Sequence, residues 1–176
     1  VEVALDLRRV AVHGDRMLLV WTARDQDRRP RIFARLIAAG RGRLLKAAER
    51  PDPFPLSTAD CGDESQPAIT GVDFQHAAFM VAWRAARCDS SGSSIRATFV
   101  TQSGQIAFNN RACDAREFTL TQTVAGDQAD ATITTTTRGS IVAAWTDFGL
   151  NGNGGNPWHG SDRSISAVRG FTAKLS

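Results

Sequence analysis

The segment between residues 146 and 162 holds the side chains best suited to chemistry. Oxygen-bearing side chains are spaced among glycines there, at Asp147, Asn151, Asn153, Asn156 and Asp162. Oxygen ligands on a flexible loop suit a hard cation such as calcium. We therefore take Asp147, Asn151, Asn153 and Asp162 as candidate calcium ligands. No Glu closes the set as in an EF-hand, and a plain long turn rich in Asn and Gly is the alternative.

The same segment offers a second chemistry through an aromatic side chain. Trp158 and His159 follow Asn156, and a Trp on a Gly- and Asn-rich loop can stack on a sugar ring or pack into a partner. A glycan site would then consist of Trp158, His159, Asn156 and Asp147. The alternative is that Trp158 folds back onto its own sheet.

No residue pattern in the chain predicts catalysis. His13, His76 and His159 have neither triad nor metal-ligand spacing, and nucleophile-elbow, phosphate-loop and HExxH motifs are absent. The chain contains no Tyr, which excludes the Tyr nucleophile of a sialidase. Acidic loop residues could supply a carboxylate pair, but charged loops offer such a set by chance.

The candidate loop belongs to one copy of a unit that the chain repeats three times. Each copy has an apolar run that ends in Trp, and the spacing is 62 residues both times, at Trp21, Trp83 and Trp145. A polar loop and an Ile-x-Ala segment follow each Trp, at Ile32, Ile95 and Ile165. The Trp-to-Ile interval is 11, 12 and 20 residues, so the third copy carries an insertion. A period of this size indicates a propeller, solenoid or array.

The second copy shows the strands of the unit most clearly. Short alternating or apolar runs predict four strands, at Gln66–Ile69, Ala78–Trp83, Ile95–Val100 and Phe118–Gln122. Polar composition predicts a loop over Cys88–Ser94 and a turn over Gln102–Gln105. The Trp residues should occupy equivalent, largely buried positions on the second strands.

The first copy should follow the same plan. We expect it to begin with a strand near Ala4–Leu7 and to end in Phe54–Ser57. Residues Arg35–Arg50 have a weak helical pattern, but Gly40 and Gly42 interrupt it, and the repeat register predicts a turn there instead.

Four short antiparallel strands in about 60 residues, without a helix, form the blade of a β-propeller. The chain resembles the tandem propeller repeats of secreted and cell-surface bacterial proteins. The residues that carry this resemblance are Gly62-Asp63, Gln66-Pro67-Ala68-Ile69, Val81-Ala82-Trp83, Ile95-x-Ala97, Gly104 and Glu117-Phe118. It implies an all-β fold of three four-stranded antiparallel blades, over residues 1–57, 58–122 and 123–176. The third copy lacks a clear fourth strand.

Three blades are fewer than the four to eight that close a propeller ring. Two open flanks would expose apolar sheet faces. We therefore expect a second copy, or another polypeptide that carries further blades, to complete the ring. No apolar run approaches the ~20 residues of a membrane-spanning helix.

The basic residues gather in the first copy. Residues 1–50 contain 12 basic and 6 acidic side chains, whereas the remainder contains 9 and 12. The densest group is Arg24, Arg28, Arg29, Arg31, Arg35, Arg41, Arg43 and Lys46. A polyanion-binding face is one interpretation, and a solvated edge is the other. Nucleic acid is not expected, because aromatic residues for base stacking are missing there apart from Phe33.

The chain has three cysteines, too few and too widely spaced for a zinc ribbon. Cys61 enters the second copy and Cys88 follows its second strand, so both belong to one end of that unit. We expect a Cys61–Cys88 disulfide, with Cys113 as the odd thiol, which implies an oxidising compartment. The hypothesis is a secreted or cell-surface binding and assembly module without catalytic activity. A lectin using the third-copy loop and a propeller-scaffold hydrolase are the alternatives.

Overall fold

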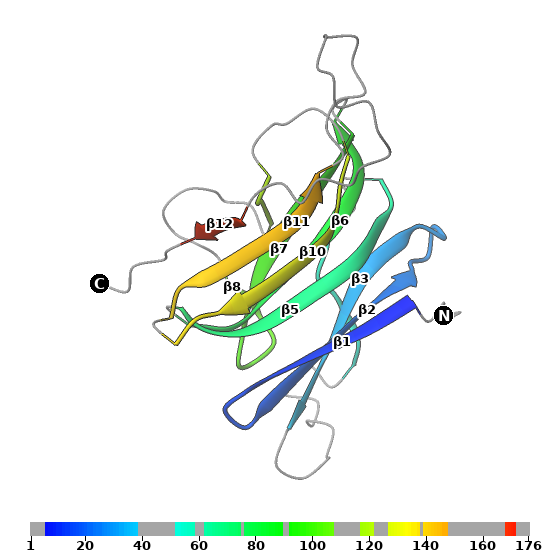
Figure 1. Cartoon of the computed structure of the whole chain (residues 1–176). Coiled ribbons are helices and arrows are strands. Elements are labelled where there is room, and N and C mark those ends of the chain that lie inside the picture. The colour runs from blue at the N-terminus through cyan, green and yellow to red at the C-terminus, as the bar shows by residue number, and fades with distance from the viewer. Residues whose placement is uncertain are drawn as a thin grey trace.

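The computed structural model describes residues 6–38, 52–58, 62–74, 76–89, 92–107, 117–121, 127–137, 139–147 and 168–171. These residues form three antiparallel sheets and contain no helix, which confirms the all-β class (Figure 1). Arg35 lies in a strand that ends at Ala38, and residues 39–50 are outside the described ranges. No helix that could cross a membrane occurs in this part of the chain.

The first sheet is a meander of four strands that pair in sequence order. They are β1 (Asp6–His13), β2 (Arg16–Arg24), β3 (Pro30–Ala38) and β4 (Phe54–Pro55). Gly14, in the two-residue turn after β1, has a φ of 58°, which glycine adopts without steric cost. Side chains alternate along β2 and β3, so Leu18, Val20 and Ile32 are fully buried on one face.

The second sheet contains five strands and the third contains three. The second comprises β5 (Glu64–Phe74), β6 (Ala77–Asp89), β7 (Gly92–Thr101), β8 (Ile106–Ala107) and β9 (Phe118–Thr119). The third comprises β10 (Gln128–Thr135), β11 (Ile141–Asp147) and β12 (Val168–Phe171). Both β8 and β9 pair with β7, so two short strands share the outer edge of the second sheet.

The repeat seen in the sequence is visible in the strand register. In every sheet the first strand bulges at the point where it passes the Trp of the second strand. The bulges lie at residues 7–8, 66–67 and 130–131, opposite Trp21, Trp83 and Trp145 respectively. Three of the four strands expected in the second copy, Gln66–Ile69, Ala78–Trp83 and Ile95–Val100, are confirmed as parts of β5, β6 and β7. Of the fourth, Phe118–Gln122, only Phe118–Thr119 is strand (β9) among the described residues.

The residues that directly follow β4 and β9 bond to the neighbouring strand of their sheet with the same pair of hydrogen bonds. In the first sheet the Leu56 amide donates to the Ile32 carbonyl (2.9 Å), and the Ile32 amide donates to Ser57 Oγ (3.1 Å). The equivalent bonds of the second sheet, at 2.8 and 3.3 Å, involve Leu120, Ile95 and Thr121.

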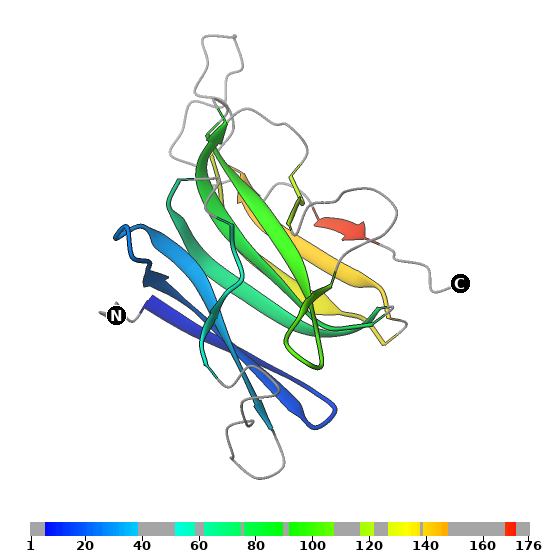
Figure 2. The ribbon, with the colours of Figure 1, turned by 180° about the vertical axis from the view of Figure 1, so that it is seen from behind.

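The second sheet lies between the other two and packs one face against each (Figures 1 and 2). One face places Phe79, Val81 and Trp83 in a cluster with first-sheet residues that include Leu18, Val20, Ala34 and Leu36. The opposite face places Met80 and Ala82 in a second cluster with Ile133, Ile141, Ala143 and Trp145 of the third sheet. The first strands β1, β5 and β10 lie side by side toward the viewer in Figure 1.

Several details differ from the sequence expectation. Only the first sheet is a plain set of four strands, and none of the three sheets is closed. Most of the predicted loop Cys88–Ser94 is strand, because the β6–β7 ladder continues to the pair Asp89–Gly92. In β12 it is Val168 that pairs with Ala144, one residue later than the Ile-x-Ala motif predicts.

The burial of the three Trp residues also differs from expectation. Trp83 is fully buried and Trp145 is 7% exposed, but Trp21 is only partly buried. The difference follows from position, since the Trp face of the first sheet packs against no other sheet among the described residues.

Candidate functional site

The loop predicted to bind calcium or a glycan lies almost wholly outside the described residues. This applies to Asn151, Asn153, Asn156, Trp158, His159 and Asp162. Asp147 is the last residue of β11, and its backbone pairs with Gln128. Within the described ranges no group of three or more His, Cys, Asp or Glu residues could hold a metal ion. The calcium and glycan sites stay predictions.

The described histidines do not form a catalytic group. His13 ends β1, and its Nε2 lies 3.2 Å from Asp73 Oδ1, whose side chain is 85% exposed. The His13 ring packs edge-on against Phe79 at 6.1 Å between centroids. This pair of a mostly buried His13 and an exposed Asp73 links the β1 and β5 ends of two sheets, and no nucleophile joins it among the contacts of the described residues.

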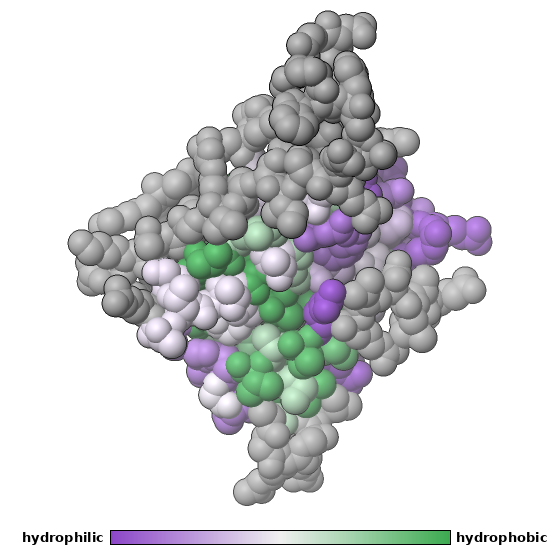
Figure 3. Space-filling model, viewed as in Figure 1, coloured by the Kyte–Doolittle hydropathy of each residue, from purple (hydrophilic) through white to green (hydrophobic). Residues whose placement is uncertain are grey.

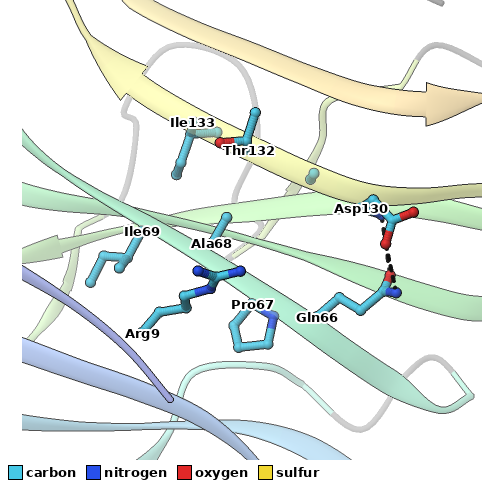
Figure 4. Close-up of a pocket in the computed structure, with 9 residues that line it drawn as sticks. Arg9, Gln66, Pro67, Ala68, Ile69, Asp130, Thr132 and Ile133 are labelled. Carbon is cyan, nitrogen blue, oxygen red and sulfur yellow. Dashed lines mark hydrogen bonds between the residues drawn. The ribbon is translucent and has the colours of Figure 1, made fainter. Parts of the chain in front are cut away.

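A hollow of about 300 Å³ opens where the three first strands meet (Figure 4). Its polar lining comes from Arg9 of β1, Gln66 of β5, and Asp130 and Thr132 of β10. Gln66 Nε2 donates to Asp130 Oδ1 (3.0 Å), and the Asp130 amide donates to Gln66 Oε1 (3.2 Å). The described lining carries one cation and one carboxylate, so it favours no ligand of a particular charge.

Gln66 and Asp130 occupy equivalent bulge positions, and each has a φ of 54°. This left-handed conformation costs a residue other than glycine on the order of 1 kcal/mol. The Gln66 side chain holds both bulges in place, because it donates to the Asp130 carboxylate and accepts from the Asp130 backbone amide. The two strained residues therefore form part of the contact between the second and third sheets.

A buried polar network joins the first sheet to the second. Arg31 is 3% exposed, and its guanidinium donates to Asp25 Oδ2 (3.2 Å) and to the Gly62 carbonyl (3.0 Å). Arg31 Nη1 also lies 3.6 Å from Glu64 Oε2. The Arg31 guanidinium thus contacts a carboxylate of the first sheet and two groups at the start of the second sheet.

Burial raises the pKa of Glu64 to about 7. The side chain is completely buried, and the nearby Glu117 carboxylate raises the pKa further, whereas Ser57 and Arg31 lower it. The ion pair with Arg31 alone would favour a low pKa. Burial prevails because neither oxygen of Glu64 accepts a well-formed hydrogen bond from the described residues, and Arg31 is shared with Asp25.

Glu117 makes a second link between these two sheets. Its Oε2 accepts a hydrogen bond from Arg96 Nη1 (3.0 Å), and its Oε1 accepts one from the Thr58 amide. Glu117 is 7% exposed and Glu64 is inaccessible to solvent. This pair of carboxylates therefore holds sheets together and is out of reach of a substrate.

The junction between the second and third sheets uses hydroxyl and amide groups in place of the buried carboxyl. Ser93 Oγ lies 2.8 Å from Asp127 Oδ1 and 2.9 Å from the Gln128 carbonyl, and it accepts a hydrogen bond from the Gln128 amide (3.1 Å). The Ser93 hydrogen bonds lower the pKa of Asp127. By register Gln128 occupies the position that Glu64 occupies in the second sheet, and it is 2% exposed.

The Trp face of the first sheet has no covering sheet among the described residues. By register one side of β1, β2 and β3 carries Val10, Val12, Met17, Leu19, Trp21, Phe33 and Ile37, with Arg35 among them opposite Leu19. Val10 and Val12 are 54% and 57% exposed, and the other members of the face are partly buried. Trp21 stacks on Phe33 at 6.4 Å between ring centroids. Figure 3 shows hydrophobic side chains at the surface over the β1–β2 hairpin.

The Arg-rich group of the first copy does not form one continuous face. Arg24, Arg28 and Arg29 are exposed around the β2–β3 turn, whereas Arg31 is buried in the network with Asp25. Residues 41, 43 and 46 lie outside the described ranges. Polyanion binding therefore stays a prediction for the exposed part alone.

Sequence reasoning missed the polar junctions between sheets. A signal was present, because Gly62-Asp63-Glu64 and Gly126-Asp127-Gln128 align in the repeat and precede the two bulges. A charged or amide side chain at the start of an inner strand, repeated at a fixed interval, indicated a shared structural role. Comparisons with family models, curated proteins and solved structures found no match.

Proposed function

We propose that the chain is a β-propeller binding and assembly module of a secreted or cell-surface protein, and that it has no catalytic activity. In this proposal the three sheets are consecutive blades. The resemblance to secreted repeat proteins supports the location, and the arrangement of the sheets supports the propeller fold.

Three observations support the blade assignment. Each sheet consists of strands that are consecutive in the chain. The first strands lie together, as the inner strands of blades do around a propeller axis. Each Trp lies opposite a bulge at the same place in its sheet. A two-layer sandwich would have two packed layers, whereas here the middle sheet packs on both sides.

The observation that carries the assembly function is the Trp face of the first sheet, which no described sheet covers. Its equivalents in the second and third sheets are buried against a neighbouring sheet. Exposed contiguous apolar patches on soluble proteins mark interaction sites. A face with the same Trp position and the same strand pattern is therefore suited to receive another sheet.

The native mass of the chain tests this proposal. Light scattering should be measured on the purified chain, and gel filtration on an extract of the cells that make it. We expect a particle larger than the 19.0 kDa chain in at least one of them. Replacing Leu19 by Glu should shift that particle to lower mass, whereas Ser103→Glu in an exposed turn should not. A single-chain mass in both preparations would overturn the proposal.

A further inference from the structure

The sheets stack according to one rule that the chain applies twice. The Trp-bearing face of the second sheet, with Phe79, Val81 and Trp83, packs on the first sheet. The first sheet meets it with the opposite face, which carries Leu18 and Val20. Each Trp face in a described junction therefore receives the other face of the preceding sheet.

The next junction repeats the rule with equivalent residues. The Trp face of the third sheet, with Ile141, Ala143 and Trp145, packs on the second sheet. The second sheet meets it with Met80 and Ala82, which lie 62 residues after Leu18 and Val20. A large Trp side chain thus enters a cluster that contains small or branched residues of its neighbour, as close packing requires.

Among the described residues, one face of this kind has no partner sheet at each end of the stack. The first sheet leaves the Trp21 face uncovered by any described sheet. The third sheet leaves Val142 and Ala144, 62 residues after Met80 and Ala82, partly exposed on its outer face. Thr134 pairs with Val142 there, as Thr70 pairs with Met80 in the occupied junction.

We propose that a second copy of this chain covers the Trp21 face with the outer face of its third sheet. This inference deepens the proposed assembly function and rests on it. Two such contacts, related by a twofold axis, would join three sheets to three and close a ring of six, within the range of propellers. A symmetric contact between two Trp21 faces is less favourable, because Trp21, Phe33 and Met17 would meet one another's large side chains in place of the smaller Val142 and Ala144.

Site-specific photocross-linking tests this contact in the full chain. p-Benzoylphenylalanine replaces Leu19, with a second probe at Val12 in case the first variant folds poorly, and a control probe replaces the exposed Gln102. Mixed heavy- and light-isotope chains identify links between copies by mass spectrometry. We expect the Leu19 or Val12 probe to link to residues 141–147 of the other copy, and the Gln102 probe not to.

The outcomes separate the two proposals. Links from residues 141–147 to the probe, lost in Ala144→Glu together with the dimer, support the head-to-tail contact. Links from one β2 strand to the other would overturn this contact and leave the assembly function intact. A stable complex in which the probe links only to a different protein would do the same. A single-chain mass at 100 µM, without links, would overturn the contact, and the same mass in the native extract would overturn the assembly function as well.

Discussion

Replacing Glu64 by Gln should remove a large part of the pH dependence of folding stability. Glu64 is completely buried between the first and second sheets, and its pKa is about 7 against an ordinary value of 4.5. The folded state therefore holds the proton more tightly than the unfolded chain between these two pH values. The free energy of unfolding should fall as pH rises through this window, and the contribution of Glu64 is complete only below pH 4.5.

The size of the effect follows from the two pKa values. A carboxyl that titrates at 4.5 in the unfolded chain and at about 7 in the fold loses about 3 kcal/mol of stabilisation between pH 4.5 and pH 8. Gln is the appropriate replacement because Gln128 occupies the equivalent position in the third sheet, buried and neutral. The Glu64→Gln chain should therefore gain stability relative to the natural chain as pH rises.

Urea denaturation at pH 4.5, 6, 7 and 8 measures this difference directly. The converse variant, Gln128→Glu, should acquire a pH dependence of the same sign at the second junction. Parallel pH profiles for the natural chain and Glu64→Gln would refute the reasoning. So would a Glu64→Gln chain that loses stability relative to the natural one as pH rises, because that would mean that the carboxylate stabilises the junction in its charged form.

Three further predictions concern the junctions and the thiols. Trp83→Ala should lower the free energy of unfolding by about 3–5 kcal/mol. Trp21→Ala should lower it by less than half as much in a matched urea titration, and equal losses would contradict the difference in burial between the two Trp residues. Ser93→Ala removes the hydroxyl that joins the second and third sheets and should lower the free energy of unfolding by about 1–3 kcal/mol. An unchanged thermal unfolding temperature would contradict this. Cys61 and Cys113 lie outside the described residues. Peptide mapping without reduction should find Cys61 bonded to Cys88, because its neighbour Gly62 donates its amide to the Ala86 carbonyl (3.0 Å) and the strands β5 and β6 that follow are antiparallel; a bridge from Cys113 to either would refute this.

The strands could be predicted from the sequence because the repeat supplies its own alignment. The 62-residue interval places Trp21, Trp83 and Trp145 on second strands, and all three positions are confirmed. Alternation then locates β7 and β9, and the plan of the second copy locates the closing strand of the first near Phe54. These features depend on local periodicity, which a sequence displays directly.

The junctions between sheets could not be predicted in the same way. The burial of Glu64 and Arg31 depends on how two sheets meet, and the low propensity of charged residues for the interior argues against it. The positive φ of Gln66 and Asp130 depends on a bulge that has no glycine to signal it. Partial exposure of Trp21 depends on which sheet is first in the stack. Each of these features is set by tertiary packing.

Covering of the Trp21 face in solution is the central claim, and hydroxyl-radical footprinting measures it most directly. Tryptic cleavage after Arg24 and Arg84 places Trp21 and Trp83 on different peptides, so that their oxidation rates can be compared within one sample. In the assembled protein Trp21 should be oxidised about as slowly as the fully buried Trp83, and several times faster in the Leu19→Glu variant. Equal and fast oxidation of Trp21 in both proteins, with Trp83 protected, would show that nothing covers this face and would contradict the account.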